Sequence, residues 1–125
     1  MPHLTIDYSP NLEAAVDMPA LCDHIRRAAI GTGVFPMAGI RVRAFAATHV
    51  SIADGDAKHG YIDISVRLRK GRTTAAKQAA TRAVFRAASD FLAPVMAQRS
   101  IALSMEMRDI DPELSPKSGT IRDHL

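Results

Sequence analysis

The second residue of the chain, Pro2, has the chemistry that is most unusual for its position. Proline is the only amino acid whose free α-amino group is a secondary amine, and residues 3–8 that follow it read as a strand. Proline cannot donate to a sheet ladder and is tolerated mainly at the first position of a strand. Removal of the initiating methionine would therefore leave a basic secondary amine at the tip of a rigid strand.

Two interpretations of Pro2 follow from the residues alone. A general base works best when its pKa lies near the working pH, and partial burial near arginines would disfavour the ammonium form and bring the pKa of this amine towards neutrality. The plain alternative is that Pro2 is incidental, because many chains begin with methionine and proline. Inside a Met1–Pro2 peptide bond the nitrogen is an amide and is inert, so the catalytic interpretation requires loss of Met1.

Arginine supplies most of the positive charge of this chain, whose net charge is +3. The planar guanidinium binds carboxylates and phosphates better than lysine does, whereas a slightly basic surface is the bland interpretation of the same composition. No dense Lys/Arg run marks a nucleic-acid or membrane surface. Tryptophan is absent and aromatic residues make up 5%, which disfavours binding by base stacking. We expect neither nucleic acid nor a membrane as partner.

Other kinds of reactive site find little support. Cys22 is the only cysteine, so no internal disulfide is possible, and its apolar helical surroundings indicate an inert thiol. The histidines show no metal-ligand spacing, and "GTG" at 31–33 ends a helix and does not open one, so we expect no metal site and no phosphate loop. The chain has no signal peptide and no apolar run near 18 residues, which predicts a cytoplasmic protein.

Hydrophobic periodicity predicts four strands and two helices. In chain order they are a strand at 3–8, a helix at 17–33, strands at 39–45 and 61–69, a helix at 71–96 and a strand at 100–108. Asp17 is the expected cap of the first helix, Thr73 or Thr74 caps the second, and Pro94 should kink or end it. The expected apolar stripe of the second helix is Ala76, Ala80, Val84, Ala87, Phe91 and Val95.

This order is two successive βαβ units, whose strands should be parallel within each unit. The expected fold is α+β (α/β), with two helices on one face of a four-stranded mixed sheet, in a single domain 1–125 with a C-terminal extension at 108–125. The other face would carry Asp7, Arg43, Asp63, Arg67, Arg69, Glu106 and Arg108. Open sheet edges are a liability, so this polar face indicates a homo-oligomer built edge to edge around a wet interior.

Several short motifs lie in a fixed order along nearly the whole chain. They are "MPH" at the start, "GVFPMAGIRVR" at 33–43, "ADG" at 53–55, "KGRTTAAKQ" at 70–78 and "ALSMEM" in the last strand. Together with the double βαβ pattern, they resemble the tautomerase superfamily and, within it, the 5-carboxymethyl-2-hydroxymuconate isomerases.

The resemblance implies roles for three residues. Pro2 matches the N-terminal proline that acts as the base, and Arg41 and Arg72 match two functional arginines that grip carboxylates and stabilise charge on a dienolate. The implied reaction is a 1,3-allylic proton shift on a dienol with three carboxylates, in homoprotocatechuate (4-hydroxyphenylacetate) breakdown. The implied assembly is a homotrimer, and neither a metal nor a cofactor takes part.

Some points stay open at the level of the sequence. Phe35 and Met37, which flank Pro36, either line the apolar part of the pocket or belong to the core. Another activity of the superfamily on a different unsaturated acid, such as a tautomerase or a hydratase-like dehalogenase, would use the same proline. A non-catalytic ligand-binding module of the same fold is the alternative from a different class.

Overall fold

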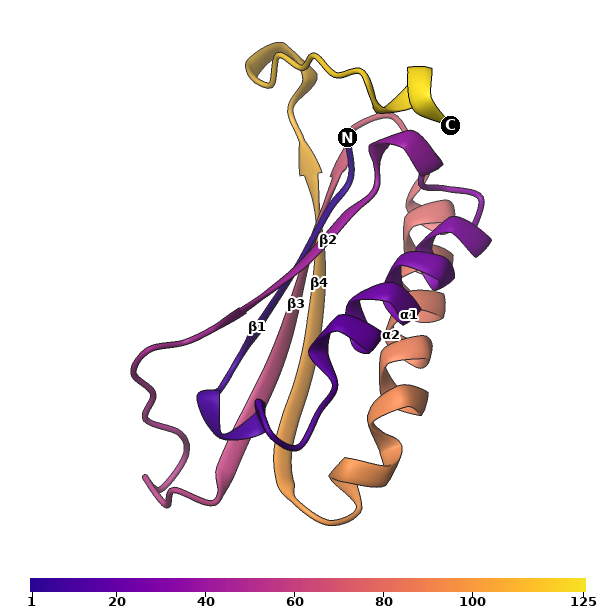
Figure 1. The fold of residues 1–125 in the computed structure, drawn as a ribbon. Coiled ribbons are helices and arrows are strands. Elements are labelled where there is room, and N and C mark those ends of the chain that lie inside the picture. Colours follow the sequence, from indigo (N-terminus) through magenta and orange to yellow (C-terminus); the bar gives the residue numbers. More distant parts are fainter.

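A four-stranded sheet with both long helices on one of its faces forms the body of the computed structural model, which describes residues 1–125 (Figure 1). The elements are β1 (His3–Tyr8), α1 (Met18–Gly31), β2 (Arg41–Ala46), β3 (His59–Arg69), α2 (Thr74–Met96) and β4 (Ser100–Ile110). Short 3-10 helices lie at Pro10–Leu12, Met37–Gly39, Pro112–Leu114 and Ile121–His124. The predicted order of elements is confirmed. Neither long helix has the apolar length needed to cross a membrane.

The sheet is mixed, as the double βαβ pattern predicted. Its strand order is β2-β1-β3-β4, with β1 parallel to β2, β3 parallel to β4, and β1 antiparallel to β3. The register places His3, at the start of β1, opposite Arg41 on one side and Arg67 on the other. The beginning of the chain is therefore held at a sheet end that is rich in arginine.

Alternate residues of the two central strands form the centre of the core. Leu4 and Ile6 of β1 and Ile64 of β3 have no exposed surface, and they pack beneath the two helices. The helices supply the other side of this layer through Met18, Leu21, Ile25 and Ala29 of α1 and Ala80, Val84, Ala88 and Leu92 of α2. Because β1 lies between two strands and under two helices, its first residues have little freedom.

The apolar stripe of α2 differs in part from the predicted one. Ala80 and Val84 are buried as predicted, but Ala88 and Leu92 continue the stripe where Ala87 and Phe91 were expected. The Phe91 ring lies 5.3 Å from the His24 ring of α1, centroid to centroid. Phe91 therefore packs towards the neighbouring helix, while the residue after it faces the sheet. The remaining predicted members, Ala76 and Val95, are half-buried.

Several predicted ends shift by a few residues. Helix α2 begins at Thr74 and not at residue 71, and it ends at Met96 as predicted, two residues beyond Pro94, whose missing N–H falls in the last turn. Strand β4 continues past Arg108 to Ile110, whose carbonyl accepts a hydrogen bond from the Lys70 amide at 3.1 Å. The segment that follows is the C-terminal tail, residues 111–125.

The predicted helix caps are present. The Asp17 carboxylate accepts from the Ala20 amide at 3.0 Å, and the Thr73 hydroxyl accepts from the Ala76 amide at 3.1 Å. Thr73 is therefore the cap of α2, and Arg72 lies directly before that fixed point. Capping of this kind satisfies backbone donors that the first helical turn leaves unpaired.

Candidate active site

Pro2 is the first fully buried residue of the chain. Its carbonyl accepts a hydrogen bond from the Arg41 amide at 3.2 Å, which ties the tip of β1 to the start of β2. A Cβ added to Gly39 would lie 2.9 Å from Cδ of Pro2, the ring carbon bonded to the nitrogen. Only glycine leaves room for the pyrrolidine ring there. The position of the Pro2 nitrogen is thus set by the strand on one side and by the Met37–Gly39 turn on the other.

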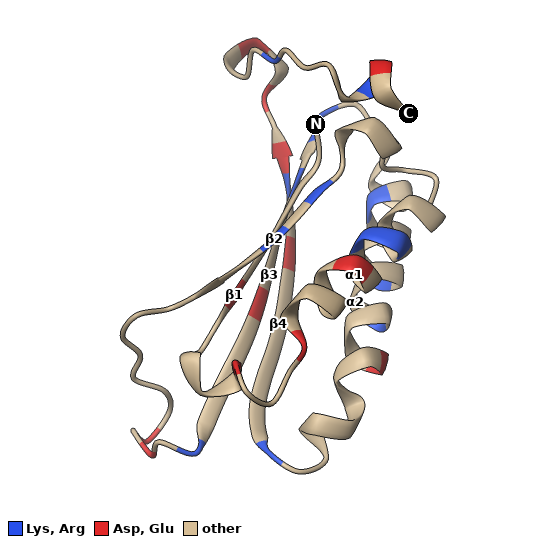
Figure 2. Cartoon of the chain, viewed as in Figure 1, with Lys and Arg blue, Asp and Glu red and all other residues tan.

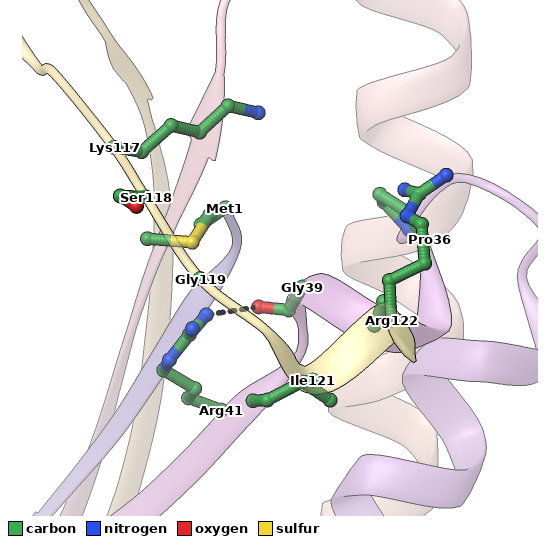
Figure 3. Close-up of a pocket in the computed structure, with 10 residues that line it drawn as sticks. Met1, Pro36, Gly39, Arg41, Lys117, Ser118, Gly119, Ile121 and Arg122 are labelled. Atoms are coloured by element: carbon green, nitrogen blue, oxygen red, sulfur yellow. Dashed lines mark hydrogen bonds between the residues drawn. The ribbon is translucent and has the colours of Figure 1, made fainter. Parts of the chain in front are cut away.

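Met1 precedes Pro2 and lines two pockets, which have Met1 and Lys117 in common; Figure 3 shows the larger one. The larger has a volume of about 410 Å³ and the smaller about 110 Å³. The larger pocket is lined by Met1, Pro36, Ala38, Gly39, Arg41, Lys117, Ser118, Gly119, Ile121 and Arg122. The smaller is lined by Met1, His3, Arg67, Arg69, Ile110, Ser115, Pro116 and Lys117. Both pockets include Met1, so loss of Met1 would open to both of them the position that it occupies next to the Pro2 nitrogen.

The surroundings of the chain start are positively charged. Figure 2 shows Lys and Arg segments of several elements gathering near the N-terminus. Burial, followed by the charges of Lys117, Arg69, Arg41 and Arg72, lowers the pKa of the Met1 amino group. These causes belong to the location, and the Pro2 amine would meet them one residue further in.

His3 experiences the same field on the open face of the sheet. Burial, with the charges of Arg67, Arg43 and Arg41, lowers the pKa of its ring. The Arg43 guanidinium lies 3.2 Å from Nδ1 of His3, a nitrogen that accepts this hydrogen bond when the ring is neutral. Burial and the neighbouring arginines therefore favour the neutral form of the residue next to Pro2.

The two predicted arginines occupy different positions. Arg41 is half-buried in the wall of the larger pocket, and its Nη1 donates to the Gly39 carbonyl at 2.9 Å, the dashed line in Figure 3. Arg72 lies outside both pockets, and its Nη1 donates to the Arg69 carbonyl at 3.0 Å. The structure thus brings Arg41 to the mouth of the site and places Arg72 behind it, where its charge still reaches the chain start.

The two predicted apolar residues lie outside the pockets of the single chain. Phe35 is 3% exposed and belongs to the core, which is one of the two alternatives that the sequence left open. Met37 is 57% exposed and faces solvent. Their neighbours Pro36 and Ala38 line the larger pocket instead, because the short turn at Met37–Gly39 rotates successive side chains to different sides.

Four cationic residues of these pockets have no assigned role in the sequence-based interpretation. Arg67 and Arg69 counted only as members of the polar sheet face, and Lys117 and Arg122 belong to the tail. The tail carries no periodic pattern, so its course back over the chain start had no sequence signal beyond two basic residues close together.

Cys22 is half-buried on α1, and burial raises the pKa of its thiol.

Comparison with known proteins identifies the family. The family described as 5-carboxymethyl-2-hydroxymuconate isomerase matches residues 2–125. The chain belongs to this family. It is 29% identical over 121 residues to the Escherichia coli 5-carboxymethyl-2-hydroxymuconate Delta-isomerase, covering 97% of this chain and 96% of that protein. The predicted family and the prediction of an enzyme of the isomerase class are confirmed.

Solved structures agree with this membership. A 5-carboxymethyl-2-hydroxymuconate delta-isomerase structure has a TM-score of 0.91 at 31% identity, covering 99% of this chain and 92% of that one. A 5-carboxymethyl-2-hydroxymuconate isomerase from Deinococcus radiodurans R1 has a TM-score of 0.90 at 26% identity, covering 98% and 92%. The fold extends to a fused 4-OT described as a symmetric trimer, with a TM-score of 0.67 at 22% identity over 94% and 92%.

The contact between Gly39 and the Pro2 ring gives a first testable prediction. Gly39→Ala places a methyl group 2.9 Å from Cδ of Pro2, so the ring or the turn must move. We expect the free energy of unfolding to fall by about 1–3 kcal/mol, typical of overpacking, and isomerase turnover to fall with it. Urea unfolding and initial rates measure both. Gly31→Ala is the matched control, because a Cβ there meets nothing within 4 Å. A Gly39→Ala variant as stable and active as the control would contradict this packing.

Proposed function

We propose that this isomerase acts on 5-carboxymethyl-2-hydroxymuconate, with the amine of Pro2 as its general base once Met1 has been removed. The placement of the Pro2 nitrogen supports this most directly: the ring is buried, and the nitrogen faces Met1, which lines two cationic pockets. The name of the Escherichia coli relative supplies the substrate. A secondary amine at the chain end needs no side chain to act as a base.

The reaction needs one group that accepts a proton from the substrate and later donates a proton to it. Pro2 takes the proton of the 2-hydroxyl and returns a proton at carbon 5. The double bonds C2=C3 and C4=C5 become a carbonyl at C2 and a double bond C3=C4, so that no atom is lost. The positive surroundings that lower the pKa of the Met1 amino group would act in the same direction on the Pro2 amine and favour its unprotonated form, as a base requires.

The arginines are proposed to act on the charge of the substrate. Arg41 lines the larger pocket with its guanidinium oriented by the Gly39 carbonyl, so it is placed to bind a carboxylate or the oxygen that becomes negative in the dienolate. Arg72 holds the Arg69 carbonyl from outside the pockets and adds positive charge at longer range. Phe35 would support the site from the core, and Met37 would meet the substrate only where another subunit closes the pocket over it.

Processing of Met1 tests the proposed base. Activity should follow the fraction of chains that begin at Pro2, because general acid–base catalysis contributes about 10²–10⁴-fold. Mass spectrometry gives that fraction, and kcat/KM is measured on the same preparations. A preparation that retains Met1 throughout and is fully active would refute Pro2 as the base.

The same base fixes the sign of the pH dependence. Below the pKa of the amine, Pro2 is protonated and idle, so kcat/KM should rise with pH through a limb near neutrality. An acidic limb near pH 4 would instead indicate a carboxylate as the base.

Arg41 and Arg72 are separable by substitution. Arg41→Ala should lower kcat/KM by roughly ten- to a hundredfold, as expected for a lost charged hydrogen bond of about 1.5–3 kcal/mol. Arg72→Ala should cost less, because its guanidinium bonds a backbone carbonyl outside both pockets. Arg26→Ala, at an exposed ion pair with Asp23 on α1, is the control and should leave kcat/KM unchanged. If Arg41→Ala behaves like the control, Arg41 does not bind the substrate.

We also propose that the chain is a homotrimer. The open sheet face carries charged residues, the strands β2 and β4 leave two edges, and Phe45 of β2 is 56% exposed. The fold is shared with a protein described as a symmetric trimer. Light scattering of a dilute sample should give about three times the chain mass of 13.5 kDa. An active monomer would show that neither edge nor face needs a partner.

A further inference from the structure

The C-terminal tail supplies half of the larger pocket. Residues 117–119 cross in front of Met1, and the short helix Ile121–His124 packs against the Met37–Gly39 turn (Figures 1 and 3). The tail is joined to the sheet at its base, where Nη2 of Arg69 donates to the Pro112 carbonyl at 3.4 Å. The tail is thus part of the site wall.

Two cationic side chains of the tail add to the arginines around the chain start. Lys117 and Arg122 line the larger pocket with Arg41, and Lys117 also lines the smaller pocket with Arg67 and Arg69. No aspartate or glutamate lines either pocket. The ion pairs of the chain involve other residues: Arg26 and Arg27 with Asp23, Lys58 with Asp56, His59 with Asp54, Lys77 with Asp109, and Arg108 with Glu106.

This arrangement is costly unless an anion compensates it. Five of the sixteen Lys and Arg side chains line these two adjoining pockets, and no carboxylate lies among the lining residues, so the local charge is strongly positive. The tail has carboxylates of its own at Asp111, Glu113 and Asp123, yet none of them pairs with a pocket cation. Like charges held close together repel, and a multiply charged anion between them removes that repulsion.

We infer that Lys117 is a substrate-binding residue that determines specificity, holding the carboxylate that distinguishes a tricarboxylate dienol from a dicarboxylate one, with Arg122 as the second cation of the tail. This inference rests on the function proposed above. Lys117 is the one cation that lines both pockets, so it can reach a substrate that occupies either side of the Pro2 nitrogen. Its charge is also the first among those that lower the pKa of the Met1 amine.

Arg41 is less suited to this selective role. Its guanidinium is already oriented by the Gly39 carbonyl beside the reacting nitrogen, where every substrate must place a carboxylate or the enolate oxygen. Lys117 stands on the tail, and no hydrogen bond or ion pair within the chain occupies its ammonium group, so it is available for a further carboxylate of the substrate. A contact with a carboxylate that does not react changes binding more than it changes the chemical step.

Kinetics with two substrates test the assignment. On 5-carboxymethyl-2-hydroxymuconate, Lys117→Met should lower kcat/KM roughly tenfold, mainly through KM, because a single exposed charged hydrogen bond is lost. On 2-hydroxymuconate, which lacks the third carboxylate, the same variant should match the wild type. Lys117→Arg keeps the charge and should retain most of the preference. Lys70→Met removes an exposed lysine at the same end of the sheet that lines neither pocket, and it should change neither substrate. Equal losses on both substrates, or a Lys117→Met variant like the control, would overturn the assignment.

Binding of an unreactive anion separates this inference from the proposed reaction. Calorimetry with propane-1,2,3-tricarboxylate and with glutarate requires no turnover, so it applies even if the chain does not isomerise the muconate. The wild type should bind the tricarboxylate more tightly, and Lys117→Met should lose that difference while Lys70→Met keeps it. A wild type that does not distinguish the two anions would overturn the role of Lys117 whatever the outcome of the activity assays.

Discussion

Burial of the Pro2 ring is the constraint on which the rest of the site depends. The ring is fully enclosed, its carbonyl is tied to β2, and the absence of a side chain at Gly39 gives it room. Behind it, β1 lies between β2 and β3, with Leu4 and Ile6 wholly buried beneath the helices. A chain terminus is ordinarily among the most mobile parts of a protein. Here the core holds the terminus still, so a terminal nitrogen can be positioned as reproducibly as a side chain.

The same site concentrates positive charge, and this charge acts in two ways. It disfavours protonation of the chain-start amine, which a base requires, and it attracts carboxylates. In the free protein the cations repel one another, and protonating the amine would add another positive charge to them. The free energy of unfolding should therefore be lower at pH values where the amine is protonated. When folding lowers the pKa of an amine, the unfolded chain binds the proton more tightly, so the protein loses stability as the pH falls through that pKa.

The sequence predicts those parts of the structure that depend on local pattern. Strict alternation of apolar and polar residues located the strands. It also predicted correctly which face of β1, β2 and β3 is polar, because successive side chains of a strand point to opposite faces. The predicted stripe of α2 had Ala87 and Phe91 where the fully buried residues are Ala88 and Leu92, and Phe91 packs at the edge of the core, since the sequence cannot tell which neighbour a helix face meets. Lys117 and Arg122 had no predicted role, because only the tertiary path of the tail brings them to Pro2. The sequence likewise could not tell that Phe35 is buried in the core while Met37, two residues later, is exposed.

Proline suits the chain start for reasons that go beyond its basicity. A residue with an ordinary side chain would present a primary amine on a freely rotating bond, with all its hydrogens available to water. The pyrrolidine ring contains the N–Cα bond, so the nitrogen cannot rotate about it, and the ring covers one side of the nitrogen with carbon. Burial of that carbon against Gly39 reduces the hydration that would stabilise an ammonium ion, so the packing that anchors the strand would also disfavour protonation of a free Pro2 amine. The contact between Gly39 and Pro2 thus sets both the position of the nitrogen and its surroundings, and a change to either surface of that contact alters both.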